Sequence, residues 1–123
     1  MVRVPLVFHE QYDLNFGRHV FPTQKYRMIR ELLLRSGEVA EADFHAPEMA
    51  TEEELCLVHD EDWVRKLRKG TISYQEILKL EVPYSRRMVD AFWLAAGGST
   101  LAGRLALAYG AAYNVGGGFH HAF

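Results

Sequence analysis

The feature that most constrains this 123-residue chain is a short, mostly apolar run, Ala111 to Val115, followed by the three glycines Gly116 to Gly118. A strand that is apolar on both faces belongs in the middle of a parallel sheet covered by helices. Glycines directly after such a strand allow unusual backbone angles and let a substrate or a neighbouring loop come close. The run predicts an α/β fold in which ligands bind beyond the carboxyl ends of the strands.

Other segments agree with this architecture. Val4 to Phe8 reads as a second buried strand followed by a polar exit. Helical spacing predicts a helix over about Gln24 to Ser36, ended by Gly37, and a long helix over about Arg86 to Tyr109, capped by Ser85. Alternating strands and helices predict a three-layer α/β/α arrangement with a mainly parallel sheet and right-handed crossovers.

Shorter elements lie between these helices. Thr51 and Glu54 form a capping-box pattern that predicts a brief helix. Residues 60–69 begin with acidic and end with basic residues, as the helix dipole favours, and predict another helix. Residues 44–47 read as a loop, and residues 57–59 as either strand or coil.

The long helix contains Gly97, Gly98 and Gly103 among small residues. Each glycine costs about 1 kcal/mol relative to alanine inside a helix. Close approach of another element is the expected reason for all three.

Composition excludes several classes of function. The chain has 14 Lys plus Arg against 16 Asp plus Glu, a formal net charge of −2, and its basic residues form no run longer than a pair. It therefore lacks the concentrated basic surface that binds nucleic acid electrostatically. Cys56 is the single cysteine, the spacings of structural zinc are absent, and no apolar run suits a membrane span. We expect a single cytoplasmic domain without direct contact to nucleic acid or membrane.

The adjacent residues His120 and His121 are the strongest candidates for chemistry. Two imidazoles this close are costly to charge together, so one stays neutral near pH 7 and suits a general base beside an electrostatic helper. The alternative is structural, with the glycines forming a turn and the histidines serving as satisfied core groups. No Gly-Lys-Ser/Thr follows the glycines, which excludes a phosphate loop, and the two histidines alone make a poor metal site.

Residues 113–122, Tyr-Asn-Val-Gly-Gly-Gly-Phe-His-His-Ala, resemble the tandem-histidine motif of the zinc-dependent histone deacetylases and their bacterial relatives, and lie close to the class IV branch. The resemblance extends to residues 97–103, to Val58-His59 and to residues 21–26, and so covers nearly the whole chain. It implies the arginase/deacetylase fold, a parallel sheet between helical layers.

The resemblance also implies an activity. Family members hydrolyse acetyl-lysine or a related acetylamide, with a zinc ion that polarises the carbonyl and activates water. By this resemblance, His121 is the general base and later the acid, and His120 is its electrostatic partner. Gly117 and Gly118 shape the wall of the substrate tunnel, and Phe119 takes the place of the aromatic residue beside the histidine pair.

Two further residues are assigned by resemblance. Glu81, before Val82-Pro83, corresponds to an acidic residue that clamps the substrate backbone, although the family more often has Asp. The alternative is an exposed loop glutamate. Arg27, five residues after Pro22, corresponds to an arginine lining an internal channel near the active site. The alternative is a solvated helix arginine.

The chain departs from the family in one respect. The zinc ligands, an Asp-x-His pair and a later Asp, and the transition-state tyrosine follow the tandem histidines in the family, and none follows them here. We expect an amino-terminal part of a deacetylase domain, 1–123, truncated after the tandem histidines. Zinc would be bound by the full-length parent, and this chain alone would be inactive.

The expected partners are an acetylated protein or small acetylamide, the missing carboxy-terminal half, and a second copy by self-association. The alternative function is a non-catalytic α/β binding or assembly module derived from a deacetylase. The tandem histidines disfavour an arginase-like hydrolase.

Overall fold

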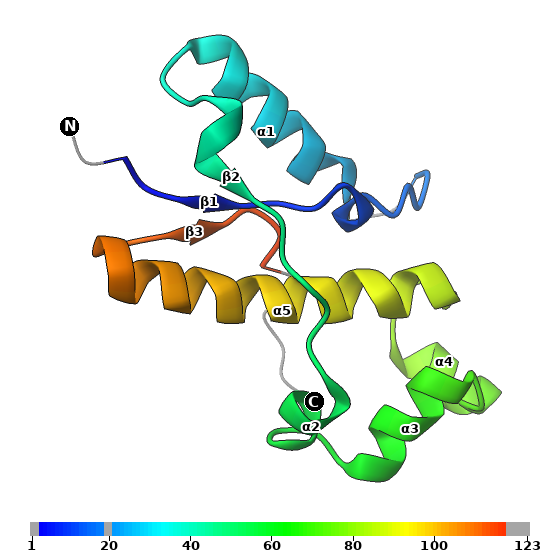
Figure 1. Ribbon diagram of the computed structural model, residues 1–123. Helices are drawn as coiled ribbons and strands as arrows, with labels where there is room; N and C mark the ends of the chain where they lie inside the picture. The colour runs from blue at the N-terminus through cyan, green and yellow to red at the C-terminus, as the bar shows by residue number, and fades with distance from the viewer. Residues whose placement is uncertain (1–2, 19–20, 118–123) are drawn as a thin grey trace.

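The computed structural model describes residues 3–18 and 21–117. Within them, three short strands form a parallel sheet in the order β2, β1, β3 (Figure 1). Leu6 of β1 pairs with β2 on one side and with β3 on the other. The parallel sheet and its helices confirm the predicted α/β class. The strands are β1 (Leu6–Val7), β2 (Phe44–His45) and β3 (Tyr113–Asn114).

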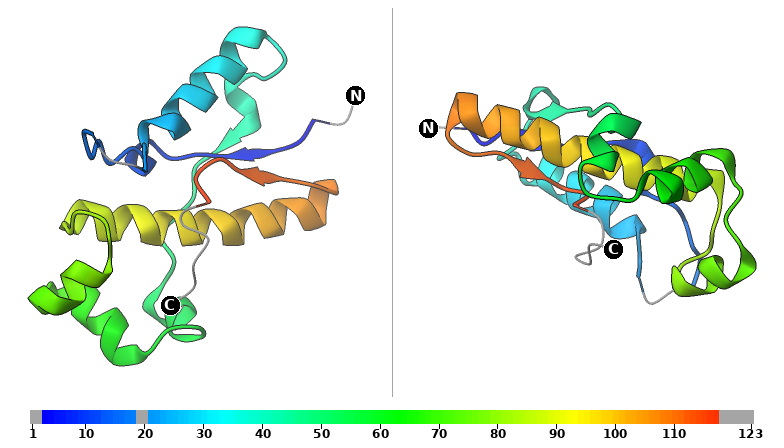
Figure 2. Two further views of the ribbon diagram at one scale, coloured as in Figure 1. Left: turned by 180° about the vertical axis from the view of Figure 1, so that it is seen from behind. Right: turned by 90° about the horizontal axis from the view of Figure 1, so that it is seen from below.

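Helices make up most of the remaining structure. Figures 1 and 2 show α1 on one side of the strands and α5 on the other, with α2, α3 and α4 grouped beyond α5. None of the described helices, not even the long α5, is long and apolar enough to cross a membrane. The helices are η1 (Glu10–Tyr12), α1 (Gln24–Ser36), η2 (Glu41–Asp43), α2 (Glu52–Cys56), α3 (Glu61–Lys69), α4 (Tyr74–Lys79) and α5 (Arg86–Tyr109).

The helix ends follow the predicted capping signals. Helix α1 ends at Gly37, whose φ of 77° is left-handed, a conformation that glycine adopts without a Cβ clash. The hydroxyl of Ser85 accepts a hydrogen bond from the N–H of Met88 at the start of α5. Thr51 and Glu54 form the predicted capping box of α2. These local signals correctly predicted the bounds of α1 and α5.

The strand predictions need correction. The segment Val4 to Phe8 contributes only two residues to the ladder. Phe44 and His45, expected in a loop, form an edge strand because they pair with β1. β3 was expected in the middle of the sheet, but β1 is the middle strand of the described sheet, with Val7 fully buried, and β3 lies at an edge with Tyr113 56% exposed. Residues 57–59, predicted as either strand or coil, form a turn, which agrees with the second alternative.

Helix α4 was not predicted, although its sequence carries the same signal as α2. The hydroxyl of Ser73 accepts from the N–H of Glu76, and the Glu76 carboxylate accepts from the N–H of Ser73. This is a capping box, the pattern that identified α2. The short η1 and η2 turns were not predicted either, and η1 replaces the expected polar exit from β1.

Two of the three glycines of α5 allow close packing. A Cβ at Gly97 would lie 1.8 Å from the carbonyl oxygen of Glu48, and a Cβ at Gly98 would lie 2.3 Å from the Tyr12 hydroxyl. Gly103 contradicts the prediction, because nothing lies within 4 Å of a Cβ placed there. The first two glycines therefore let neighbouring segments reach the helix backbone.

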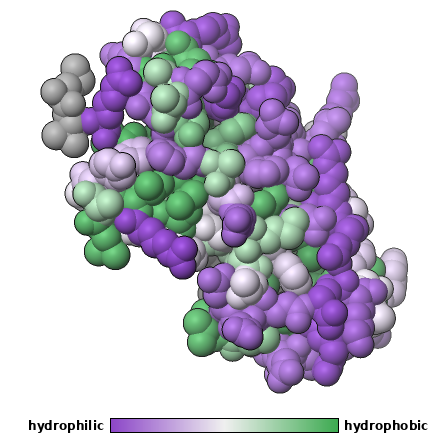
Figure 3. Space-filling model, viewed as in Figure 1, coloured by the Kyte–Doolittle hydropathy of each residue, from purple (hydrophilic) through white to green (hydrophobic). Residues whose placement is uncertain are grey.

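The core lies around the carboxyl ends of the strands. One buried cluster joins α1, η1 and α5 and consists of Phe8, Tyr12, Tyr26, Leu94, Ala95 and Val115. The space-filling view shows a mostly hydrophilic surface with hydrophobic patches on the face of Figure 1 (Figure 3). Large apolar side chains exposed on the described surface include Leu57 and Leu107.

Candidate active site

The candidate site lies where the three parallel strands end. In parallel sheets the carboxyl ends share one edge, and ligands bind there. After β1 the chain forms η1, whose last residue, Tyr12, lies at this edge. After β3 it continues through Val115 to Gly116 and Gly117. A small cavity of about 20 Å³ lies beside Tyr12, Tyr26 and Gly116.

Tyr12 is a buried side chain with a polar group at this edge. It is 3% exposed and packs edge-to-face against Phe8 and Tyr26, with ring centroids 5.9 and 6.0 Å away. Its hydroxyl donates to Oδ1 of Asn114 over 3.0 Å. Burial raises the pKa of the Tyr12 phenol well above its ordinary value, which keeps the hydroxyl protonated and able to donate.

Asn114 binds three segments through one side chain. Its Oδ1 accepts from the Tyr12 hydroxyl and, over 3.3 Å, from the N–H of Gly116. Its Nδ2 donates to the carbonyl oxygen of Ala95 over 3.1 Å and lies 3.4 Å from the Ser99 hydroxyl. The end of β3 is thereby fixed to both η1 and α5.

Gly116 and Gly117 have different surroundings. A Cβ at Gly116 would lie 2.1 Å from Cδ2 of the Tyr12 ring, so a side chain does not fit there without movement. Gly117, predicted to shape a tunnel wall, is exposed, and nothing in the described chain lies within 4 Å of a Cβ placed there. The turn is therefore tightly packed at Gly116 and open at Gly117.

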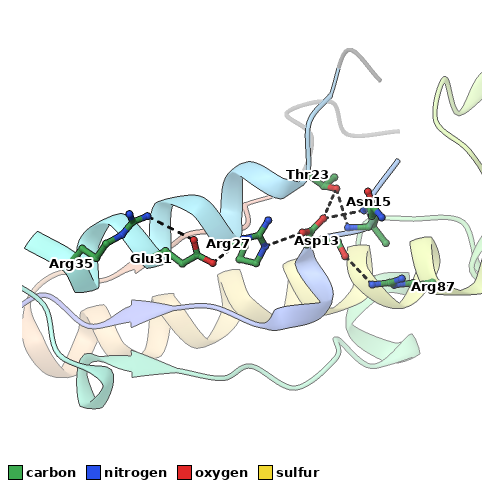
Figure 4. A network of polar contacts seen from close by, with 8 residues as sticks. Asp13, Asn15, Thr23, Arg27, Glu31, Arg35 and Arg87 are labelled. Atoms are coloured by element: carbon green, nitrogen blue, oxygen red, sulfur yellow. Dashed lines mark hydrogen bonds and ion pairs between the residues drawn. The ribbon is translucent and has the colours of Figure 1, made fainter. Parts of the chain in front are cut away.

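Arg27, predicted as a channel residue, belongs to a polar network on α1 (Figure 4). Its Nη1 donates to Glu31 over 2.8 Å, and its Nε lies 3.5 Å from Oδ2 of Asp13. The hydrogen bond to Glu31, followed by that carboxylate's charge, raises the pKa of the Arg27 guanidinium. The side chain is 52% exposed and stays charged in this arrangement.

Asp13 organises the same network, as Figure 4 shows. Its Oδ1 accepts from the N–H of Asn15 over 3.0 Å and lies 3.4 Å from the Thr23 hydroxyl. Its carbonyl oxygen accepts from Arg87 of α5 over 3.2 Å. Thr23 is buried, and its Oγ1 accepts from the N–H of Leu14. The segment after η1 is therefore held between α1 and α5.

Arg27 faces an open hollow of about 720 Å³ next to Phe8, at the end of β1. Three arginines and three carboxylates line it, so positive and negative groups are matched. A hollow of this size with fixed charges can admit small polar molecules and water. The lining charged residues are Glu10, Asp13, Arg27, Arg30, Glu31 and Arg87.

The remaining predicted residues are placed as follows. Glu81 is exposed in the loop that joins α4 to α5 and has a left-handed φ of 58°, which is uncommon outside glycine. Its assignment as a substrate clamp stays a prediction. Gly118, Phe119, His120 and His121 lie outside the described residues.

The described part of the chain offers no ready metal site. Across residues 3–18 and 21–117, no group of three or more His, Cys, Asp or Glu side chains could hold a metal ion. His9 has a local structural role, because its Nδ1 accepts from the N–H of Gln11 and caps η1. The described residues therefore do not provide the donor set of a zinc enzyme.

Tyr12 and Asn114 are the residues that the sequence did not reveal as a pair. Asn114 belongs to the tandem-histidine motif, and Tyr12 follows a predicted strand end. The sequence analysis therefore included both positions but did not predict the hydrogen bond between them. Buried Thr23 and its neighbour Asp13 were also missed. The only local signal was their place near a strand exit or a helix start.

Comparison with known families identifies the class of protein that this fold and site define. The model of the histone deacetylase domain matches residues 19–123, which is most of the chain. The chain belongs to this family, as the tandem-histidine motif indicated. Membership carries with it the arginase/deacetylase fold, consistent with the parallel sheet between helices.

Individual relatives agree with this membership. An uncharacterized protein of Picosynechococcus sp. is 34% identical over 120 residues, covering 97% of this chain and 40% of the relative. Histone deacetylase 2 of Arabidopsis thaliana is 26% identical over 129 residues (97% and 33%), and the acetoin utilization protein AcuC of Bacillus subtilis is 28% identical over 127 residues (95% and 31%). The chain thus spans between 31% and 40% of the length of these relatives.

Proposed function

We propose that this chain supplies the tandem-histidine part of a zinc-dependent deacetylase that hydrolyses acetyl-lysine or a related acetylamide. His121 serves as the general base that takes a proton from the attacking water, and later as the acid that protonates the leaving amine. His120 stays beside it as an electrostatic partner. Coupling between adjacent imidazoles keeps one of them neutral near pH 7, as a base requires.

One observation carries the proposal: β3 ends in a turn that is fixed at the carboxyl edge of the sheet. The side chain of Asn114 accepts a hydrogen bond from the N–H of Gly116, and the Tyr12 ring packs against the same glycine. The sequence continues from there through Gly118 and Phe119 to the two histidines. Family membership supports deacetylase chemistry at this position.

The other residues take roles around the histidine pair. Gly117, Gly118 and Phe119 form part of the wall of the substrate tunnel. Arg27 lines a channel, a role supported by its place in the 720 Å³ hollow beside the end of β1. Glu81 holds the substrate backbone from the loop before α5.

Zinc in this proposal belongs to the complete enzyme. When bound there, it polarises the acetyl carbonyl and lowers the pKa of water. The described residues do not fit a zinc site, so no step of the proposal depends on a zinc ion held by them. Their contribution is the placement of the proton-transferring groups.

The test is hydrolysis of an acetyl-lysine peptide by the complete protein in which these residues occur naturally. We expect zinc-dependent hydrolysis that His121→Ala lowers by at least about 100-fold, the size of a lost general base. His59→Ala is the matched control, because His59 lies in the turn after α2, a helix that Figure 1 shows on the far side of α5 from the strands. Equal activity of His121→Ala and His59→Ala would remove His121 from the mechanism.

The 123-residue polypeptide by itself is proposed to be inactive, because the zinc ligands implied by the resemblance follow the tandem histidines. The same assay on this polypeptide should give no zinc-dependent hydrolysis. Hydrolysis that requires both zinc and His121 would contradict this part of the proposal.

A second candidate function is a non-catalytic binding or assembly module derived from a deacetylase. The observation that favours it is the exposure of large apolar side chains, with Leu107 91% and Leu57 85% exposed on the described surface. An inactive complete protein, with its zinc bound and its substrate range tested, would favour this candidate over the enzyme.

A further inference from the structure

We propose that Tyr12 is a positioning residue for the tandem histidines, acting through Asn114 and Gly116 on the turn that precedes them. This inference rests on the proposed function, because it assigns Tyr12 a task in the same site. Tyr12 is not a catalytic residue: its hydroxyl bonds to protein and lies in the core. It acts by fixing the backbone from which the histidines extend.

The first argument is steric. The Tyr12 side chain lies close to two glycines, with its hydroxyl beside Gly98 on α5 and its ring beside Gly116 after β3. A Cβ on either glycine would come within 2.3 Å of a Tyr12 atom. Such close approach leaves the side chain almost no freedom to shift, so the packing of the β3 turn against α5 depends on the position of Tyr12.

The second argument is the hydrogen bonding. The Asn114 side chain uses its oxygen for Tyr12 and Gly116 and its nitrogen for Ala95. These bonds fix which way the amide faces, since a flipped amide would place its nitrogen against the Gly116 N–H and its oxygen against the Ala95 carbonyl oxygen. The Tyr12 hydroxyl completes this set by donating to the same oxygen that accepts the Gly116 N–H.

The third argument concerns what a loss of this bond does. Phenylalanine at position 12 keeps the ring and its packing and removes only the donor. Asn114 then keeps its bonds to Gly116 and Ala95 but loses the bond to η1, so the side chain that holds the turn at Gly116 is fixed less tightly. Catalytic rates depend steeply on such placement, because shifts of about 1 Å can cost about 100-fold.

The experiment uses the complete protein and compares Tyr12→Phe with Tyr26→Phe. Tyr26 is the matched control, because it is buried in the same cluster, packs against Tyr12, and is not among the bonding partners of Asn114. We expect Tyr12→Phe to lower kcat at least about 10-fold with little change in KM, and Tyr26→Phe to leave both unchanged. Unchanged kcat in Tyr12→Phe would overturn the inference.

A second readout separates this inference from the proposed function. NMR spectra of the two variants report the amide shifts from Gly116 to His121 and the titration of the two imidazoles, whether or not the protein hydrolyses anything. We expect both to change in Tyr12→Phe and to match wild type in Tyr26→Phe. If wild type proves inactive, the proposed function fails, and these shifts alone decide whether Tyr12 positions the histidines.

A double variant, Tyr12→Phe with Asn114→Ala, distinguishes an effect through Asn114 from a general loss of structure. In the background of Asn114→Ala, the acceptor of the Tyr12 hydroxyl is already gone, so adding Tyr12→Phe should change the amide shifts no further. Additive effects of the two substitutions would show that Tyr12 acts by another route and would overturn the inference.

Discussion

Gly116 and Gly103 show how one residue type can have opposite roles in the same fold. The first lies against the Tyr12 ring, whereas open space surrounds the second on α5. Glycine is a steric requirement at the first position. At the second it is only a cost in backbone entropy.

Alanine substitutions should therefore have opposite effects at these two positions. Gly116→Ala is expected to lower the free energy of unfolding by about 1–3 kcal/mol, as overpacking does. Gly103→Ala is expected to raise it by about 0.5–1 kcal/mol, because alanine favours the helix. Urea denaturation measures both. Equal stability of the two variants would show that the Tyr12 ring does not need the space at Gly116.

At the scale of elements, α3 and α4 are joined through one carboxylate. Glu76 accepts from the N–H of Ser73 over 2.7 Å in the capping box of α4, and from Lys66 of α3 over 2.9 Å. The Ser73 N–H and then the Lys66 ammonium lower the pKa of Glu76 to about 2. The ionised carboxylate thus stabilises both the start of α4 and its contact with α3.

The sign of the pH dependence follows from this lowered pKa. A carboxyl with a depressed folded-state pKa stabilises the fold above its unfolded pKa of 4.5 and loses that contribution as the pH falls through about 2. We expect the Tm difference between wild type and Glu76→Gln to be largest above pH 4.5 and to shrink towards pH 2. Glu53→Gln, at an exposed position of α2, is the control. A Tm difference independent of pH would contradict the assignment.

Local signals in the sequence were enough for the long helices and not for the strands. Helices α1 and α5 carry their start and stop signals within a few residues of each end, at Gly37 and Ser85 for example. The strand β2 carries none, because Phe44 and His45 become a strand only by pairing with β1. Edge and middle positions in a sheet likewise depend on partners distant in sequence, which is why β3 was misplaced.

For the whole molecule, burial is concentrated in one part of the chain. Every buried residue of α5 lies between Met88 and Gly98, and both residues of β1 are buried. Helices α2 and α4 have no buried residue. Local opening should therefore cost far less in α2 and α4 than around the sheet.

Hydrogen exchange tests this distribution. We expect the amides of β1 and of residues 88–98 to exchange most slowly, and those of α2 and α4 to exchange fastest. The reason is that opening the sheet or the first half of α5 exposes the core, whereas opening α2 or α4 exposes little. Uniform exchange rates along the chain would contradict this expectation.

The turn of the candidate site lies at the end of a parallel strand, as the sequence predicted, but the contacts within that turn were missed. The strand-then-glycine pattern placed it at the carboxyl edge, and Gly98 was expected to admit another segment. That segment turned out to be Tyr12, whose contact with Asn114 depends on how the complete sheet brings distant residues together. No local pattern contains that information, so this pair required the three-dimensional structure.

The bond between Tyr12 and Asn114 spans 102 positions of the sequence and has a consequence for synthesis on the ribosome. β1 is made first and is the middle strand, yet its neighbour β3 is made only after all the described helices. Domains form from their amino ends as they emerge, and contacts of such long separation form slowly. The nascent chain therefore carries Val7 and Tyr12 without their cover from β3 until residue 114 has been made, and during that interval they are open to contact with a chaperone.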